Sequence, residues 1–296
     1  MNDWEVGLST GCFYRRPFLD CLQPISRGGF SLLEVCSYPD HLDYHDLRVV
    51  RRAAQELARL GMECYSFHGP FADPIDLSAP DEPLRKSALA DMLQAVEAAA
   101  VLGARYFVLH PGPDRVIALS DEERRERLIR AAGSVTAVAR RCRELGPELV
   151  LENMLPHLAL GSQSDFFAIV DTLAGEVPGF CLDTGHAHLS GNLQELLLRM
   201  KGRLRMLHGN DNRGAFDDHF PPGQGSIDWG AFLQELTATG FCGGIILELA
   251  ESADVERTLQ GAREARLFLH QLTPGARKNL QPVPTAPPNA AVFDRR

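Results

Sequence analysis

Short runs of apolar residues alternate along the chain with longer segments in which apolar residues recur at helical spacing. Residues 106–109, Tyr-Phe-Val-Leu, form one such run, which is typical of a strand buried on both faces. Residues 46–60 show the second pattern and are followed by Gly61, as expected for an amphipathic helix and its end. The predicted strands cover residues 6–9, 32–35, 63–68, 105–110, 148–152, 180–183, 204–208 and 244–249. The predicted helices cover residues 17–28, 46–60, 81–102, 120–145, a segment that begins at Ser162 or Ser164, and residues 192–201, 228–239 and 254–272.

This regular alternation predicts an α/β protein with a parallel sheet. An open, doubly wound sheet is the rival arrangement, but eight regular units favour closure into a single (β/α)₈ TIM barrel, which needs about 250 residues. We therefore predict one barrel domain over residues 1–272. Residues 273–296 are rich in Pro, Ala and Asn, and this composition predicts a disordered C-terminal tail.

Composition excludes several classes of function. The net charge of -9 disfavours binding to nucleic acid, because an acidic surface repels phosphate backbones. No apolar run approaches the ~20 residues of a membrane helix, and the first residues do not resemble a secretory signal. The seven cysteines form no C-x-x-C pair and are interpreted as reduced core thiols. These features predict a cytoplasmic protein without a membrane or nucleic-acid partner.

Nucleotide-cradle and Schiff-base chemistry also lack support. The chain has no G-x-G-x-x-G after a strand and no G-x-x-x-x-G-K-[ST] motif, which dinucleotide and phosphate cradles use. Its lysines are Lys86, Lys201 and Lys278. None ends a predicted strand, whereas Schiff-base catalysis needs a lysine at the reacting centre.

The strongest chemical signal lies at the ends of the predicted strands. Strands three to eight each end at or next to a metal-ligand type of residue, in the order His68, His110, Glu152, Asp183, His208 and Glu248. Active sites of TIM barrels lie at the carboxyl ends of the strands. Imidazole and carboxylate groups on a rigid frame suit Zn²⁺, Mn²⁺ or Mg²⁺, and a bound cation offsets the cost of burying charged groups. Six such residues in register therefore predict a divalent-metal site.

The segments that carry these residues resemble the xylose-isomerase-like TIM-barrel superfamily, which includes sugar isomerases, sugar epimerases and the zinc enzyme endonuclease IV. The resemblance extends over residues 5–270. It rests on the segments FHGPF, VLHPG, LEN, LDTGHAH, HGNDN, DDHFPPGQGSIDW and ILE.

The resemblance implies two alternative sites. By similarity to the isomerases and epimerases, Glu152, Asp183, His208 and Glu248 hold one metal, Glu152 and Glu248 transfer a proton, and His186 holds the substrate. Similarity to endonuclease IV implies three zinc ions. The first is held by His68, His110 and Glu152, the second by Asp183, His208 and Glu248 with Glu152 bridging, and the third by His186, Asp217 and His219.

Four further residues are candidates for substrate binding or support. Glu34 ends the second strand, His188 follows His186 closely, and Arg213 and Arg115 lie in loops after strands. An arginine in such a loop can bind phosphate or carboxylate. We predict substrate contacts for His186, His188, Glu34 and Arg213.

The sequence thus predicts an isomerase or epimerase of a small sugar or sugar phosphate that uses one to three Mn, Mg or Zn ions. In this hypothesis Glu152 and Glu248 are the acid–base pair around an enediolate. The alternative is a multi-zinc phosphoesterase acting on a small phosphoester; DNA repair is disfavoured by the charge. A non-catalytic sugar- or metal-binding barrel is a third hypothesis. A homo-oligomer is a further expectation, without a predicted interface.

Overall fold

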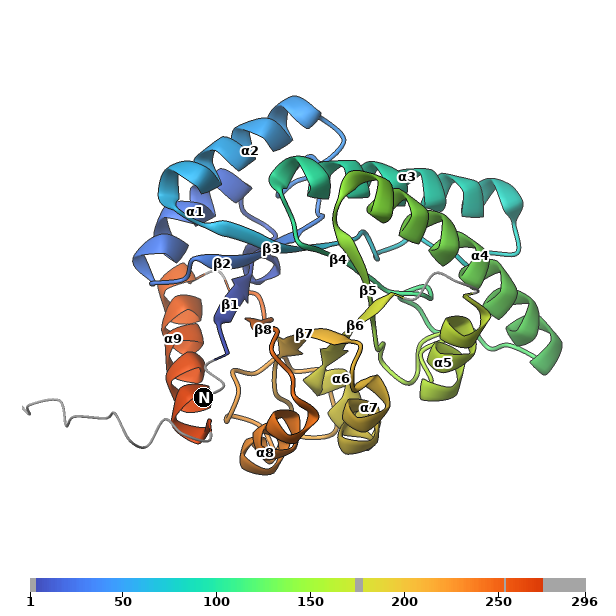
Figure 1. The fold of residues 1–296 in the computed structure, drawn as a ribbon. Coiled ribbons are helices and arrows are strands. Elements are labelled where there is room, and N and C mark those ends of the chain that lie inside the picture. The colour runs from blue at the N-terminus through green and yellow to red at the C-terminus, as the bar shows by residue number, and fades with distance from the viewer. Residues whose placement is uncertain (1–3, 174–177, 253, 274–296) are drawn as a thin grey trace, which may run out of the picture.

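The computed structural model describes residues 4–173, 178–252 and 254–273. Eight parallel strands close into a barrel in chain order, with β1 paired to β8, and the helices form a ring outside it (Figure 1). The strands are β1 (Val6–Ser9), β2 (Leu32–Cys36), β3 (Glu63–His68), β4 (Tyr106–Leu109), β5 (Glu148–Glu152), β6 (Gly179–Asp183), β7 (Leu204–Gly209) and β8 (Gly244–Leu247). The predicted (β/α)₈ barrel is confirmed.

The outer layer follows the predicted pattern of helices. The helical elements are η1 (Thr10–Phe13), α1 (Phe18–Arg27), α2 (Leu47–Leu60), α3 (Glu82–Leu102), α4 (Asp121–Leu145), α5 (Gln163–Thr172), α6 (Thr184–Leu189), α7 (Leu193–Met200), α8 (Trp229–Thr239) and α9 (Val255–Leu272). No helix among the described residues is long and apolar enough to cross a membrane. Of the predicted tail, residues 273–296, only Thr273 belongs to the described residues, and its hydroxyl donates to the Leu269 carbonyl.

Alternating side chains along each strand serve two buried clusters. Val108 and Val150 belong to a small cluster, whereas their neighbours Phe107 and Leu151 belong to the large cluster that includes helical residues. Since successive side chains of a strand point to opposite faces, the small cluster fills the barrel interior below the carboxyl ends of the strands. Its members are Leu32, Tyr65, Tyr106, Val108, Val150, Cys181, Met206 and Ile246. The polar groups at the carboxyl ends of the strands lie above this cluster.

Local sequence signals account for the ends of several helices. The Ser120 hydroxyl and the Glu123 side chain form a capping box at the start of α4. Gly61 and Gly103 end α2 and α3 with φ of 65° and 73°, a left-handed conformation that glycine adopts without steric cost. These local signals set where each helix begins or ends, and the chain then continues into the next strand.

Two short elements at the upper face were not predicted. Helix α6 follows β6 directly and carries His186, and η1 follows β1. The β4 and β8 strands are shorter than predicted, so His110 and Glu248 each lie one residue beyond a strand end. The side chain of Asp183, the last residue of β6, accepts a hydrogen bond from the His186 amide and caps α6. The strand end and the helix start are therefore one structural unit.

Candidate metal centre and cavity

A cavity of about 420 Å³ opens at the carboxyl ends of the strands. This volume lies in the range of small-molecule binding sites, about 300–1,000 Å³. Side chains predicted from the sequence line it, namely His68, His110, Glu152, His186, Asp217, His219 and Glu248. Asp183 and His208 are fully buried beside it. All nine predicted metal ligands therefore gather at one end of the barrel.

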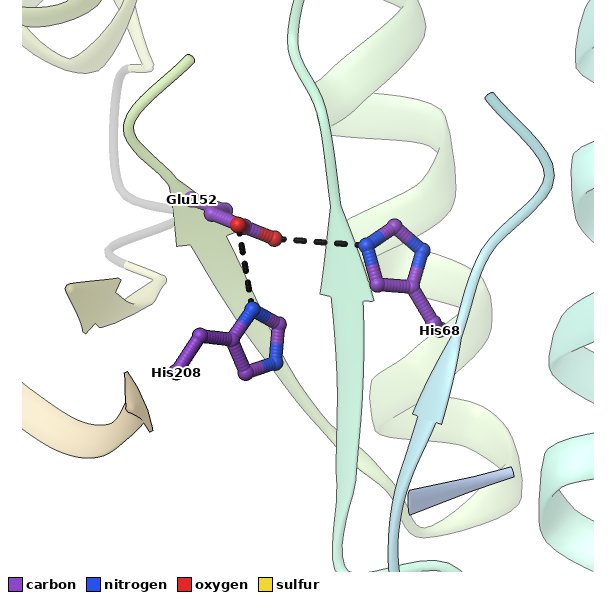
Figure 2. Close-up of side chains that lie close together, drawn as sticks. All are labelled: His68, Glu152 and His208. Carbon is purple, nitrogen blue, oxygen red and sulfur yellow. Dashed lines mark ion pairs between the residues drawn. The ribbon is translucent and has the colours of Figure 1, made fainter. Parts of the chain in front are cut away.

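Glu152 lies at the centre of the cluster. Its Oε2 atom is 3.3 Å from His68 Nε2 and 3.2 Å from His110 Nε2, and its Oε1 atom is 3.0 Å from His208 Nδ1. Figure 2 shows Glu152 between the rings of His68 and His208, which come from different strands. The side chain is almost fully buried. Three imidazoles around one buried carboxylate create a strongly polar environment at the end of β5.

A second group shares Glu152 and His208 with the first. Glu152, Asp183, His208 and Glu248 each present a ligand atom, and these atoms lie within 4.8 Å of one another. Glu248 Oε2 is 3.4 Å from His208 Nδ1. Asp183 Oδ2 accepts a hydrogen bond of 2.6 Å from the Asn210 side chain, which holds this carboxylate in place.

The third group comes from α6 and the loop between β7 and α8. Asp217 Oδ2 lies 3.0 Å from His219 Nε2 and 3.6 Å from His186 Nε2. His219 has a φ of 48°, which is uncommon for a residue other than glycine and is concentrated at functional sites. Its backbone conformation turns the ring toward Asp217 and Glu248.

Hydrogen bonds to one ring nitrogen orient these histidines. The Nδ1–H groups of His68, His186 and His219 donate to the backbone carbonyls of Gly69, Asn153 and Glu248, at 2.8, 2.9 and 3.1 Å. Their Nε2 atoms face the acids. His208 is reversed, since Nε2 donates to Glu34 and Nδ1 faces Glu152. Metal-binding histidines use this arrangement, in which the second nitrogen fixes the tautomer and the ring orientation.

Several buried polar atoms in the cluster have no hydrogen-bond partner among the described residues. These atoms are both ring nitrogens of His110, Glu152 Oε2, His208 Nδ1 and Asp217 Oδ1. Buried polar groups are normally paired, and exceptions call for a ligand or ion. A divalent cation is the ligand type that nitrogen and carboxylate donors share, so the residues present fit a metal ion.

The cluster shifts the pKa values of its members in opposite directions. Burial alone would lower the pKa of His68, but the close contact with the Glu152 carboxylate and its charge outweigh burial and raise this pKa to about 9. Burial would raise the pKa of Glu152, but the charges of His208 and His110 hold it well below its usual value. Burial, opposed by the charge of His208 and aided by the charges of Glu34 and Glu152, raises the pKa of Glu248 to about 8. The two glutamates thus differ in their tendency to hold a proton.

The grouping of ligands differs in one respect from the set implied by endonuclease IV. The compact group around Glu152 contains His68 and His208, whereas His110 contacts Glu152 but does not belong to a group in which all ligand atoms lie within 4.8 Å. The His186, Asp217 and His219 group agrees with the expectation.

Of the residues predicted to contact substrate, only some lie in the cavity wall. His186 lines the cavity, but Glu34 is fully buried outside the cavity wall and binds Ser9, Ser66 and His208. Glu34 therefore holds His208, a candidate metal ligand, and does not contact the cavity.

His188 and the two loop arginines do not reach the cavity. His188 Nε2 lies 2.8 Å from Ser226 Oγ, and the Arg213 guanidinium lies over the Phe220 ring, 5.1 Å from its centroid. Arg115 is paired with Asp73 and Asp76. Neither His188 nor Arg213 belongs to the cavity wall, because the fold of their loops gives both side chains partners elsewhere.

Asn153, Asn210 and Asp211 are supporting residues without a predicted role. The side chain of Asn153 forms two hydrogen bonds with the backbone of Asp183, at 2.8 and 3.0 Å. Asp211 accepts from Trp229 Nε1 and from the amides of Asn212, Gly223 and Ile227, at 2.9 to 3.2 Å. These bonds tie together the loop that carries Asp217 and His219. The available sequence signal was their position: Asn153 directly follows Glu152 in LEN, and Asn210 and Asp211 lie two and three residues after His208 in HGNDN.

The closed eight-stranded barrel places the chain among the TIM-barrel proteins. Within this class, residues 22–272 match the family model of the xylose isomerase-like TIM barrel, and the chain belongs to this family. It is 27% identical over 260 residues to Uncharacterized protein MJ1614 of Methanocaldococcus jannaschii, a match that covers 88% of this chain and 98% of the relative.

Two solved structures share the fold. A D-tagatose 3-epimerase-like protein superposes with a TM-score of 0.77 at 22% identity, covering 90% of this chain and 98% of that chain. A zinc-soaked protein from Thermus thermophilus, TTHB071, gives a TM-score of 0.64 at 26% identity, with coverages of 89% and 98%.

Proposed function

We propose that this protein is a divalent-metal-dependent isomerase or epimerase of a small sugar or sugar derivative. The observation that carries the proposal is the pair Glu152 and Glu248, two carboxylates at one end of the barrel that share His208 as a neighbour and border one cavity. Membership of the xylose isomerase-like family and the fold shared with a D-tagatose 3-epimerase-like protein support it.

The metal would be held by Glu152, Asp183, His208 and Glu248, whose ligand atoms already lie close together. When bound, a divalent ion would polarise the carbonyl and neighbouring hydroxyl oxygens of a sugar and would stabilise the negative charge that develops when the hydroxyl-bearing carbon next to the carbonyl loses its proton. Asn210 and Glu34 would hold Asp183 and His208 in position through their hydrogen bonds.

Glu152 and Glu248 would carry the proton. One glutamate removes the proton from the carbon next to the carbonyl, and the other delivers a proton to the same carbon from the opposite side or to its neighbour. Two carboxylates whose environments push their pKa values apart suit such a division of acid and base roles. In the metal-free protein the pKa of Glu152 lies well below and that of Glu248 above the ordinary value.

Solvent-proton exchange tests this proposal directly. The metal-loaded protein is incubated in D₂O with a panel of ketoses and aldoses, and deuterium incorporation at carbon and product formation are followed by NMR. Glu152→Gln and Glu248→Gln should each reduce exchange about 10²–10⁴-fold, the usual contribution of a general acid or base. Glu148→Gln is the matched control, because Glu148 lies at the opposite end of β5 and pairs with Arg205 at the surface. Wild-type exchange rates in both active-site variants would refute the mechanism.

A zinc phosphoesterase is the second candidate. The group of His186, Asp217 and His219 favours it, because a site for one metal does not need three further ligands, whereas multi-metal sites clamp attacking and leaving oxygens of a phosphoester. Hydrolysis of small phosphodiesters by the zinc-loaded protein, without conversion of sugars, would support this candidate over the isomerase.

A further inference from the structure

A buried histidine joins two chain segments at the carboxyl end of the barrel. His41 lies in the loop between β2 and α2 and is only 4% exposed. Its Nδ1–H donates to the Arg16 carbonyl at 2.5 Å, and its own carbonyl accepts from the Phe18 amide at 2.8 Å. Arg16 lies between η1 and α1, and Phe18 begins α1. His41 therefore ties the loop after β2 to the segment that follows β1 and η1.

Among the described residues, the ring of His41 has a single polar partner. Its Nε2 atom is buried without a hydrogen bond to any of them, and its face meets the Phe18 ring edge-on, with centroids 5.5 Å apart. Burial lowers the pKa of His41 against the effect of the bond to the Arg16 carbonyl, so the ring is neutral at neutral pH and carries its proton on Nδ1. The orientation of the ring therefore depends on the bond to Arg16 and on the contact with Phe18.

The two joined segments carry part of an aromatic wall of the cavity, which consists of Tyr14, Tyr38 and Phe71. The rings of Tyr14 and Tyr38 have centroids 4.8 Å apart, and the Tyr38 ring lies 6.3 Å from that of Phe71. The Phe71 ring in turn lies 4.9 Å from that of His68 and 5.3 Å from that of His110. The aromatic wall thus extends from the joined segments to two candidate metal ligands.

Hydrogen bonds of His41 hold the backbone on both sides of the Tyr14–Tyr38 contact. The His41 amide donates to the Tyr38 carbonyl at 2.9 Å. On the other side, Arg16, which accepts from the His41 ring, lies two residues after Tyr14. His41 itself is not part of the cavity wall. Any effect of His41 on a bound molecule must therefore pass through the two tyrosines.

We infer that His41 is a positioning residue, which holds Tyr14 against Tyr38 and thereby fixes the aromatic wall that a substrate meets. The kinetic consequence of this inference rests on the proposed function. A displaced wall weakens the binding of the substrate and of the transition state alike, because neither tyrosine belongs to the candidate metal groups. Loss of such uniform binding raises KM and leaves kcat unchanged.

Fluorine NMR of protein labelled with fluorotyrosine tests the positioning role without any substrate. The five tyrosines, whose signals Tyr→Phe variants assign, are Tyr14, Tyr38, Tyr44, Tyr65 and Tyr106. His41→Phe keeps a ring beside Phe18 but removes the donor, so the signals of Tyr14 and Tyr38 should shift or broaden. Those of Tyr65 and Tyr106, which belong to the small interior cluster, should stay in place. His41→Asn keeps a donor near the position of Nδ1 and should restore the wild-type signals. Unchanged Tyr14 and Tyr38 signals in His41→Phe, or equal changes in all five, would overturn the inference.

Steady-state kinetics then test the consequence for the substrate. With a sugar that the Mn²⁺-loaded wild type converts, His41→Phe should raise KM about 3–10-fold, the usual effect of one lost hydrogen bond, and leave kcat within about twofold. His45→Phe is the matched control, because His45 lies on the same loop but pairs with Asp91 of α3. It should leave KM and the two tyrosine signals unchanged. A fall in kcat without a rise in KM in His41→Phe would overturn the inference. If the wild type converts no sugar, the proposed function fails, and the NMR signals still decide the positioning role.

Discussion

Glu34 and His208 form a fully buried pair, in which His208 Nε2–H donates to Glu34 Oε2 at 2.9 Å. Glu34 also accepts from the hydroxyls of Ser9 and Ser66, at 3.1 and 2.9 Å. Burial alone would raise the pKa of Glu34, but the charge and hydrogen bond of His208 and the charge of His68 outweigh it and hold this pKa at about 2. An ionised Glu34 therefore fixes the His208 ring with Nδ1 directed at Glu152 and Glu248.

We predict that Glu34→Gln weakens metal binding about 10–100-fold, as loss of the carboxylate partner of a ligating histidine does elsewhere. Equilibrium dialysis against Mn²⁺ or Zn²⁺ measures this directly. Glu63→Gln, at the exposed start of β3, is the matched control and should bind metal as the wild type does. Unchanged metal affinity in Glu34→Gln would mean that His208 is oriented by packing alone.

Metal content distinguishes the two candidate functions. If the isomerase proposal holds, elemental mass spectrometry of the purified protein should find about one divalent ion per chain, held by the group that contains Asp183 and His208. His208→Ala should lose this ion, and His219→Ala should retain it. About three zinc ions per chain, reduced to two by His219→Ala, would instead support the phosphoesterase.

The stability of the metal-free protein should fall as the pH rises. Burial alone would lower the folded-state pKa of His68, but the adjacent Glu152 carboxylate raises it to about 9, above the ordinary 6.5. That of Glu248, raised by burial, is about 8 instead of 4.5. Groups with a raised folded-state pKa bind protons more tightly when folded. Their stabilisation is full below the unfolded pKa and is lost as the pH rises through the folded value.

Glu34 has the opposite effect, because its folded-state pKa lies below the ordinary 4.5. Its stabilisation is full above 4.5 and is lost as the pH falls toward 2. We therefore expect the Tm of chelated protein to be highest near pH 4.5 and to decline from there through pH 9, first through Glu248 and above about pH 6.5 also through His68. Differential scanning calorimetry in the presence of a chelator measures this profile. Equal Tm values at pH 6 and pH 9 would contradict it.

Added metal should reverse the alkaline loss. Metal binding displaces protons from histidine and carboxylate ligands, so affinity rises with pH. At about 100 times the dissociation constant, the metal should add roughly 2.7 kcal/mol to the free energy of unfolding. The increase in Tm on adding Mn²⁺ or Zn²⁺ should therefore be larger at pH 8.5 than at pH 5.5. An equal increase at both values would indicate that the titrating groups are not the ligands.

The stability of the loop that carries Asp217 and His219 should depend on the hydrogen bonds that Asp211 accepts. Trp229→Phe removes the 2.9 Å hydrogen bond from the indole to this buried carboxylate, and hydrogen bonds to charged groups contribute roughly 1.5–3 kcal/mol. We expect a loss of this size in urea unfolding. Trp4→Phe is a matched comparison, because Trp4 donates to the neutral carbonyl of Phe241, and its loss should cost only about 0.5–1.5 kcal/mol. Equal costs in both variants would contradict a special role for Asp211.

The sequence predicted the barrel well because its signals are local. Continuous apolar runs such as residues 106–109, and helix ends at Gly61 and Gly103, depend on neighbours within a few residues. Helix α6 escaped prediction because it spans only Thr184–Leu189, too short for a helical period to stand out. Its N-cap, Asp183, was predicted as a strand-end metal ligand, and its side chain also accepts a hydrogen bond from the His186 amide in the first turn of this helix.

The sequence by itself determined which residues gather at the carboxyl ends of the strands, because these ends meet at one face of a closed parallel barrel. It therefore placed His68, Glu152 and Glu248 together from strand ends alone. Only the tertiary structure decided which partner each side chain takes. Glu34 lies behind His208, Arg213 stacks on Phe220, and Tyr14, Tyr38 and Phe71 form one wall. These contacts depend on loop conformation and side-chain direction. Many of them join residues far apart in the sequence, so no local sequence pattern predicts them.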